Sequence, residues 1–255
     1  MSKAKAFEYD IENPKTKKSA ILYYDICGYK QLIGNDPQLF HKRIDSIVRL
    51  ALKGKLYKYK IFSDNFLTSL PMVVHHAHTV MCMVQEAAFR QWLLLSSEIL
   101  IRGAIVYGDI YNSADYVFGT GLIEAVEIES STSNPKIVIS ENGCKIIKDR
   151  IEYMSDSQID TSLFLADNTG VTFVNYLSDM LNHHNYSGDE KGVDFYLAQY
   201  KTFIEKNLNS DLDEKATDKY QWTADYYNYF ITKNSLNKDF LIEISPKYSF
   251  EDVKF

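Results

Sequence analysis

Apolar runs and amphipathic stretches alternate along the first 150 residues. Residues 19–25 are almost continuously apolar and rich in β-branched and aromatic side chains, which predicts a buried strand. Apolar residues at helical spacing predict long helices over about 36–53 and 75–98, and Asp36-Pro37 is a typical helix start. The remaining predicted elements are strands at 56–62, 65–70, 99–107 and 137–140 and helices at 119–130 and 141–149.

This order of strands and helices predicts an α+β sandwich, with helices on one face of a largely antiparallel sheet. We divide the chain into a polar lead-in (1–17), a main domain (18–150) and an extension (151–255) that packs on the domain or on a dimer. In the extension, a strand is suggested at 173–177 and helices at 190–208 and 213–233, whereas the polar stretch around His183 and His184 suggests a loop.

Composition and charge exclude several classes of protein. Hydrophobic residues make up 45% and charged residues 24% of the chain, values typical of soluble globular proteins. The net charge of −6 argues against a nucleic-acid-coating protein. Three scattered cysteines indicate neither a disulfide framework nor a zinc site, and they fit a reducing cytoplasm. Neither a signal peptide nor a membrane span is expected from the apolar runs.

Two aspartates at predicted strand ends are the strongest chemical signal. Asp25 closes the strand at 19–25, and Asp64 lies in the turn between the strands at 56–62 and 65–70. A single aspartate after a strand is usually a turn former or a helix cap. Two that meet in space can hold Mg²⁺ or Mn²⁺ against a triphosphate.

Five motifs in order resemble the class III nucleotidyl cyclase homology domain over about residues 18–150. They are Asp25-Ile-x-Gly-Tyr, Lys60-Ile-Phe-Ser-Asp-x-x-Leu, Ile101-Arg-Gly-Ala-Ile-x-x-Gly, Phe118-Gly-x-Gly-x-x-x-Ala-x-x-x-Glu and Ile137-Val-Ile-Ser. Further details resemble the pyrimidine cyclases of the Pycsar antiphage system and extend the likeness to about residue 230. These details are Ser63, the strand Arg102-Gly-Ala-Ile, Lys219-Tyr-Gln-Trp and Tyr227-Asn228.

The resemblance implies a class III cyclase-like ferredoxin-type sandwich with a helical C-terminal extension. It implies that the carboxylates of Asp25 and Asp64 and the backbone carbonyl of Ile26 hold two Mn²⁺ or Mg²⁺ ions in each site. Backbone N–H groups of residues 26–30, including Gly28 and Tyr29, are expected to meet the triphosphate. The active sites are expected at a homodimer interface, so that one chain alone is inactive.

Three further side chains are candidates for reading the base. Lys60 and Tyr116 fall at positions where purine cyclases read adenine or guanine, and Arg102 is a candidate for contacting a base carbonyl or a phosphate. These groups supply donors suited to the two carbonyls of uracil. We therefore expect UTP in preference to CTP, giving cUMP (or cCMP) and pyrophosphate. The resemblance implies that the product is a second messenger in antiphage defence by abortive infection. A separate effector protein is expected to sense it.

Several alternatives stay open. Ile123 and Glu127 replace the Asn and Arg that stabilise the transition state in most class III cyclases, so a catalytically degenerate, nucleotide-binding or regulatory domain is a second hypothesis. The alternative to a substrate-binding role for Arg102 is an ion pair on an edge strand. The histidines at 75, 76 and 78 fit a helix start better than zinc, and the aromatic run at 220–235 fits a packed helix better than a nucleobase platform. A diguanylate-type domain would need a different signature at Phe62–Phe66.

Overall fold

The computed structural model describes residue 12 and residues 14–51, 57–72, 75–154, 159–187 and 192–255. Most of the predicted lead-in, and the end of the helix predicted over about 36–53, lie outside these residues. The first part of the chain forms β1 (Lys17–Ile26), α1 (Tyr29–Asn35), α2 (Pro37–Ala51), β2 (Lys58–Phe62), β3 (Asn65–Pro71), α3 (His76–Leu95), β4 (Ile101–Asn112), β5 (Val117–Phe118), α4 (Thr120–Ser131), β6 (Ile137–Ile139) and α5 (Glu141–Met154).

The chain after residue 154 is more than a helical extension. It forms β7 (Phe164–Asp167), β8 (Thr172–Val174), α6 (Tyr176–Ser187), α7 (Gly192–Leu208), α8 (Glu214–Lys233) and β9 (Phe250–Asp252), with short 3-10 turns η2 (Thr161–Leu163) and η3 (Lys238–Phe240). Its three strands continue the sheet of the main domain in the order β2-β3-β1-β4-β6-β8-β7-β9, while β5 pairs with β4. Among the described strands only β4 and β6 pair in parallel, so the predicted α+β architecture with a mostly antiparallel sheet is confirmed.

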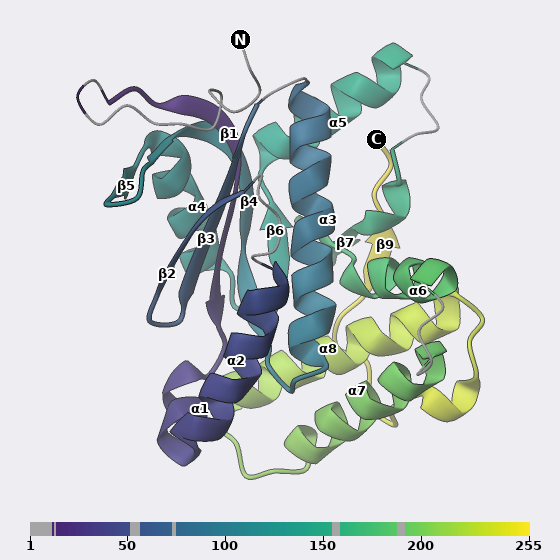
Figure 1. Ribbon diagram of the computed structural model, residues 1–255. Helices are drawn as coiled ribbons and strands as arrows, with labels where there is room; N and C mark the ends of the chain where they lie inside the picture. The colour runs from purple at the N-terminus through teal and green to yellow at the C-terminus, as the bar shows by residue number, and fades with distance from the viewer. Residues whose placement is uncertain (1–11, 13, 52–56, 73–74, 155–158, 188–191) are drawn as a thin grey trace.

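Helices cover both faces of this sheet (Figure 1), which corrects the expectation of helices on one face. The cause lies in β1. Its successive side chains point to opposite faces of the sheet, and the side chains on both faces are apolar. Leu22 and Tyr24 belong to the core beneath α3, whereas Ile21 and Tyr23 belong to a second core beneath α4. A strand that is apolar on both sides needs a cover on each.

Local sequence signals account for several helix boundaries. The Asp36 carboxylate accepts the backbone N–H groups of Gln38 and Leu39 at 3.1 and 2.9 Å and caps α2, as predicted. The imidazole of His75 similarly accepts the N–H of Ala77 at the start of α3, so the histidine cluster begins a helix. No group of three or more potential metal-binding side chains occurs among the described residues.

The loop predicted around His183 and His184 is wrong, because both residues belong to α6. That helix buries Tyr176, Leu177 and Met180 on one side, and its polar C-terminal half lies beyond this apolar anchor. The aromatic run in α8 is a packed helix face, as predicted, with Trp222 and Tyr226 fully buried. None of the described helices combines the length and the apolar character needed to cross a membrane.

A buried ion pair fastens the extension to the main domain. Lys136, just before β6, bonds to Asp167 at the end of β7, and Trp222 of α8 donates its indole N–H to the same carboxylate at 3.3 Å. Burial alone would raise the pKa of Asp167, but the bonds from Lys136 and Thr169 outweigh it and lower the pKa. The two parts of the chain therefore share one sheet and one buried polar anchor.

Candidate active site

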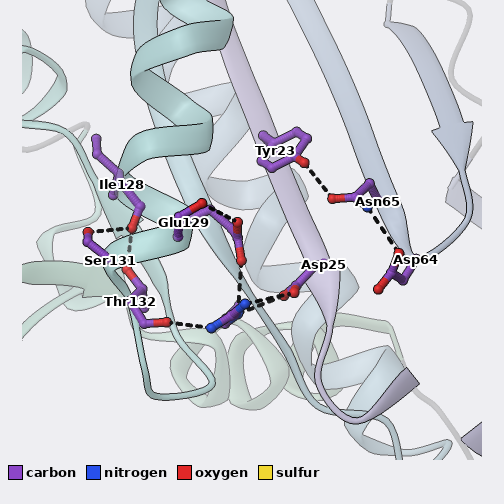
Figure 2. Close-up of polar contacts among 10 residues, drawn as sticks. Tyr23, Asp25, Asp64, Asn65, Ile128, Glu129, Ser131 and Thr132 are labelled. Carbon is purple, nitrogen blue, oxygen red and sulfur yellow. Dashed lines mark hydrogen bonds and ion pairs between the residues drawn. The ribbon is translucent and has the colours of Figure 1, made fainter. Parts of the chain in front are cut away.

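The two predicted aspartates lie at the ends of neighbouring strands (Figure 2). Asp25 is paired with Asn65 in the β1–β3 ladder, and the backbone N–H of Ile26 donates to the carbonyl of Asp64 at 3.2 Å. The carboxylate of Asp25 is mostly buried, with 16% of its side chain exposed. The structure thus brings together the residues that the sequence paired.

A left-handed turn places Asp64. Ser63, between β2 and β3, has a φ of 57°, a region that L-residues other than Asn, Asp and Gly rarely adopt. The side-chain amide of Asn65 then donates to Oδ1 of Asp64 at 3.0 Å, and the hydroxyl of Tyr23 donates to the carbonyl oxygen of the Asn65 side chain. Sequence reasoning missed Tyr23 and Asn65, which hold Asp64 at the turn.

Arg102 holds both oxygens of Asp25. Its Nε and Nη2 atoms donate to Oδ1 and Oδ2 at 3.0 and 3.1 Å, a bidentate pair across the β1–β4 ladder. Its Nη1 atom donates to the carbonyl of Thr132 at 3.0 Å. β4 lies inside the sheet between β1 and β6, so the edge-strand interpretation of Arg102 is wrong, although its ion pairing is present.

A third carboxylate, Glu129 of α4, completes this group. Its Oε1 lies 2.9 Å from Nε of Arg102, and only 8% of its side chain is exposed. Figure 2 shows Asp25, Glu129 and Thr132 around the shared guanidinium. The sequence contained a signal for Glu129: it extends the buried positions Gly121 and Ala125 at a spacing of four residues, so a charge falls on the buried side of the helix.

Two facing glycines allow α4 to lie this close. A Cβ atom on Gly108 of β4 would come within 2.8 Å of the Gly121 backbone, and one on Gly121 would meet Gly108 at 3.1 Å. Side chains at these positions would push the helix off the strand. The Gly-x-Gly motif therefore has a packing role that brings Glu129 over Arg102.

Neighbouring acidic groups shift the protonation of the site. Burial, then the charge of Asp25, raises the pKa of Glu129, while Arg102 opposes the shift. Burial also raises the pKa of Tyr23, and the charges of Glu129, Asp25 and Asp64 add to that shift. One tyrosine hydroxyl therefore lies in the field of all three carboxylates.

The donor atoms suit a divalent cation, with one condition. Carboxylate and carbonyl oxygens are the ligands that Mg²⁺ and Mn²⁺ take, and Oδ2 of Asp64 accepts no hydrogen bond from the described residues. Asp25, in contrast, gives both oxygens to Arg102. A cation that binds Asp25 must share these oxygens with the guanidinium or displace it from one of them.

The predicted base-reading residues form a second, separate group. The ammonium of Lys60 donates to the carbonyl of Ala114, in the loop that carries Tyr116. Tyr116 is 43% exposed and stacks on Tyr111 and Phe118 at centroid distances of 5.4 and 6.0 Å. No described contact joins Lys60 or Tyr116 to the aspartates.

Lys60 of this second group faces the same side of the sheet as Asp25. Lys60, Leu67 and Tyr23 are paired across β2, β3 and β1, and paired residues share a face. Lys60 lies four residues before Asp64, about 13 Å along a strand, while ten residues of β4, about 33 Å of straight strand, separate Arg102 from Asn112. One chain therefore carries Lys60 on the face of Asp25 without joining the two groups.

Gly28 and Tyr29 follow directly after β1. Gly28 has a φ of 75°, which glycine adopts without strain, and it precedes the short helix α1. Tyr29 packs edge-on against Phe40 at 5.4 Å, so its ring has a structural contact. Their role toward a triphosphate remains a prediction.

No protein-family model matches the chain, and no curated protein matches it. Among solved structures, the guanylyl cyclase domain of the RhoGC fusion protein from the aquatic fungus Blastocladiella emersonii is 19% identical over 63% of this chain and 98% of that chain, with a TM-score of 0.43. A class III adenylyl cyclase-like ATP-binding protein from Pseudomonas aeruginosa is 10% identical over 65% and 40% of the two chains, with a TM-score of 0.46.

The adenylate/guanylate cyclase/hydrolase from Silicibacter pomeroyi is 23% identical over 63% of this chain and 95% of that chain, with a TM-score of 0.38. Similarities with TM-scores below 0.5 carry no argument about activity.

Proposed function

We propose that this protein is a divalent-metal-dependent nucleotidyl cyclase that converts a pyrimidine nucleoside triphosphate, UTP in preference to CTP, to the 3′,5′-cyclic monophosphate. The single observation that carries the proposal is the meeting of Asp25 and Asp64 at adjoining strand ends. The five ordered sequence motifs that resemble class III cyclases include both residues.

In the proposed reaction the ribose 3′-oxygen attacks the α-phosphorus. A new P–O bond forms, the bond to the β-phosphate oxygen breaks, and pyrophosphate leaves with the electron pair while the 3′-hydroxyl proton passes to solvent. Asp25, Asp64 and the carbonyl of Ile26 are the groups that would hold the cation, which supplies charge stabilisation to attacking and leaving oxygens. Arg102 and Glu129 orient Asp25.

The active unit in this proposal is a homodimer. Lys60 lies on the same face as Asp25 without contacting the aspartates, and its ammonium bonds to the loop that carries Tyr116. Four apolar side chains are each at least 42% exposed: Phe62, Tyr116, Phe118 and Ile123. A second copy that covers these side chains can place its Lys60 and Tyr116 opposite the aspartates of the first.

The base preference follows from hydrogen-bond chemistry. A lysine and a tyrosine hydroxyl are donors that suit the two uracil carbonyls, while cytosine has one carbonyl and an amine that needs an acceptor. As the sequence resemblance implies, the cyclic product acts as a second messenger in antiphage defence and is read by a separate effector.

A catalytically silent domain that binds nucleotide is the alternative. Two observations favour it: the apolar side chain of Ile123 and the carboxylate of Glu127 supply no hydrogen-bond donor, and Arg102 neutralises Asp25. This alternative predicts that nucleotide binds and is recovered unchanged.

Incubation of the purified protein with each of the four ribonucleoside triphosphates and Mn²⁺, followed by mass identification of the products, tests the proposal. We expect cUMP and pyrophosphate as the main products. Faster cyclisation of ATP or GTP would overturn the pyrimidine assignment, and binding without any product from all four nucleotides would establish the silent alternative.

A further inference from the structure

A hollow of about 700 Å³ lies between the segment after β1 and the first turns of α8. Figure 1 shows the start of α8 beside α1, below the end of β1. Cys27 and Gly28 form part of its wall, and Lys30, Lys215 and Lys219 add three ammonium groups. Lys215 and Lys219 are four residues apart in α8 and so share one side of that helix.

The charges around this hollow do not cancel. Three lysines face two carboxylates there: Glu98 pairs with Arg43 at 3.2 Å, and Asp213, which keeps its charge, accepts the backbone N–H of Ala216 at 2.8 Å as the cap of α8. The three lysines form no ion pair with any described residue. In a chain of net charge −6, this is a local excess of positive charge that suits a polyanion.

Lys219 is the central group of the three. Its side chain is half-buried, whereas Lys30 and Lys215 are exposed. It lines the hollow together with Cys27 and Gly28.

We propose that this hollow binds the pyrophosphate end of the nucleotide, with Lys219 and Lys215 of α8 as its main contacts. The proposal rests on the proposed cyclase function and adds a substrate subsite made by the C-terminal extension. Gly28 follows Asp25 by three residues, at most about 10 Å of extended chain, so a triphosphate whose α-phosphate lies by Asp25 reaches the hollow. The leaving pyrophosphate then departs along the lysines.

Calorimetric titration of the full-length protein with pyrophosphate alone tests this subsite without any turnover. We expect the double variant Lys215→Gln/Lys219→Gln to bind pyrophosphate at least about tenfold more weakly than the unsubstituted chain. Lys145→Gln, on exposed α5, is the matched control and should bind normally. Thermal unfolding followed by circular dichroism checks that the double variant is folded.

Failure of this subsite and failure of the cyclase proposal are distinguishable. If the folded double variant binds pyrophosphate like the unsubstituted chain, or if the unsubstituted chain does not bind it at millimolar concentration, the subsite is refuted even when cyclic product forms. If pyrophosphate binds through the lysines but no nucleotide is cyclised, the subsite stands and the cyclase proposal fails.

Discussion

The carboxylate group around Asp25 and the aromatic group around Tyr116 differ in almost every physical respect. The first is mostly buried and tightly paired: Arg102 bonds to both oxygens of Asp25 and lies 2.9 Å from Glu129. The second is exposed and held by ring stacking and one lysine bond. A site that is complete in one chain would present both to a common cavity, and this chain keeps them apart.

The difference shows what each group needs from its surroundings. Charges that hold a cation require fixed, partly desolvated partners, which the sheet interior supplies within one chain. Groups that read a base need an open surface until the substrate or a second copy covers them. We therefore expect substitutions in the two groups to behave differently.

The largest effect is expected from the aspartates themselves. Asp25→Asn or Asp64→Asn should lower cyclisation by about 10³-fold, because losing a metal carboxylate removes several kcal/mol of charge stabilisation. The measurement is the rate of cyclic product formation with Mn²⁺, and Asp149→Asn, an exposed carboxylate on α5, is the control. Near-normal turnover by either variant, with a native circular dichroism spectrum, would remove the basis of the proposal.

Mixing an aspartate variant with a base-reading variant tests whether the groups work across chains. In a heterodimer of Asp25→Asn with Lys60→Ala/Tyr116→Ala, one of the two sites combines intact aspartates with an intact base-reading group. Random pairing of equal amounts should restore about a quarter of the normal rate, since half of the dimers carry one good site. No recovery above the sum of the two variants, with mixed dimers demonstrated by mass, would place the whole site in one chain.

The strand and helix order was predictable because it depends on local patterns, and the pairing of Asp25 with Asp64 followed from strand ends. The partners of Asp25 were not all predictable, since Glu129 reaches Arg102 only through the close approach of Gly108 and Gly121. The strands β7 and β9 were missed because each is short and becomes a strand only by joining an existing sheet edge. Contacts that span long sequence separations leave little trace in periodicity.

Base selection is expected to show a smaller effect. Lys60→Gln and Tyr116→Phe should each narrow the preference for UTP over CTP, which we expect to be about ten- to a hundredfold in the unsubstituted chain. Each change removes a donor to a uracil carbonyl and leaves the aspartates untouched. The ratio of kcat/KM for the two nucleotides is the measurement, and an unchanged ratio in both variants would show that other residues read the base.

The smallest effect, about tenfold, concerns Glu129 and the release of Asp25. The buried carboxylate of Glu129 lies 2.9 Å from Nε of Arg102, where it competes with Asp25 for the same guanidinium. Glu129→Gln removes that competing charge, so Arg102 should hold Asp25 more firmly and a cation should bind less well. The measurement is the electron paramagnetic resonance signal of Mn²⁺ in the absence of nucleotide. We expect the Mn²⁺ concentration for half-maximal binding to rise about tenfold. Glu127→Gln, on the exposed side of α4, is the matched control and should leave it unchanged. If Mn²⁺ binds Glu129→Gln as tightly as the unsubstituted chain, or more tightly, Glu129 does not loosen the hold of Arg102 on Asp25.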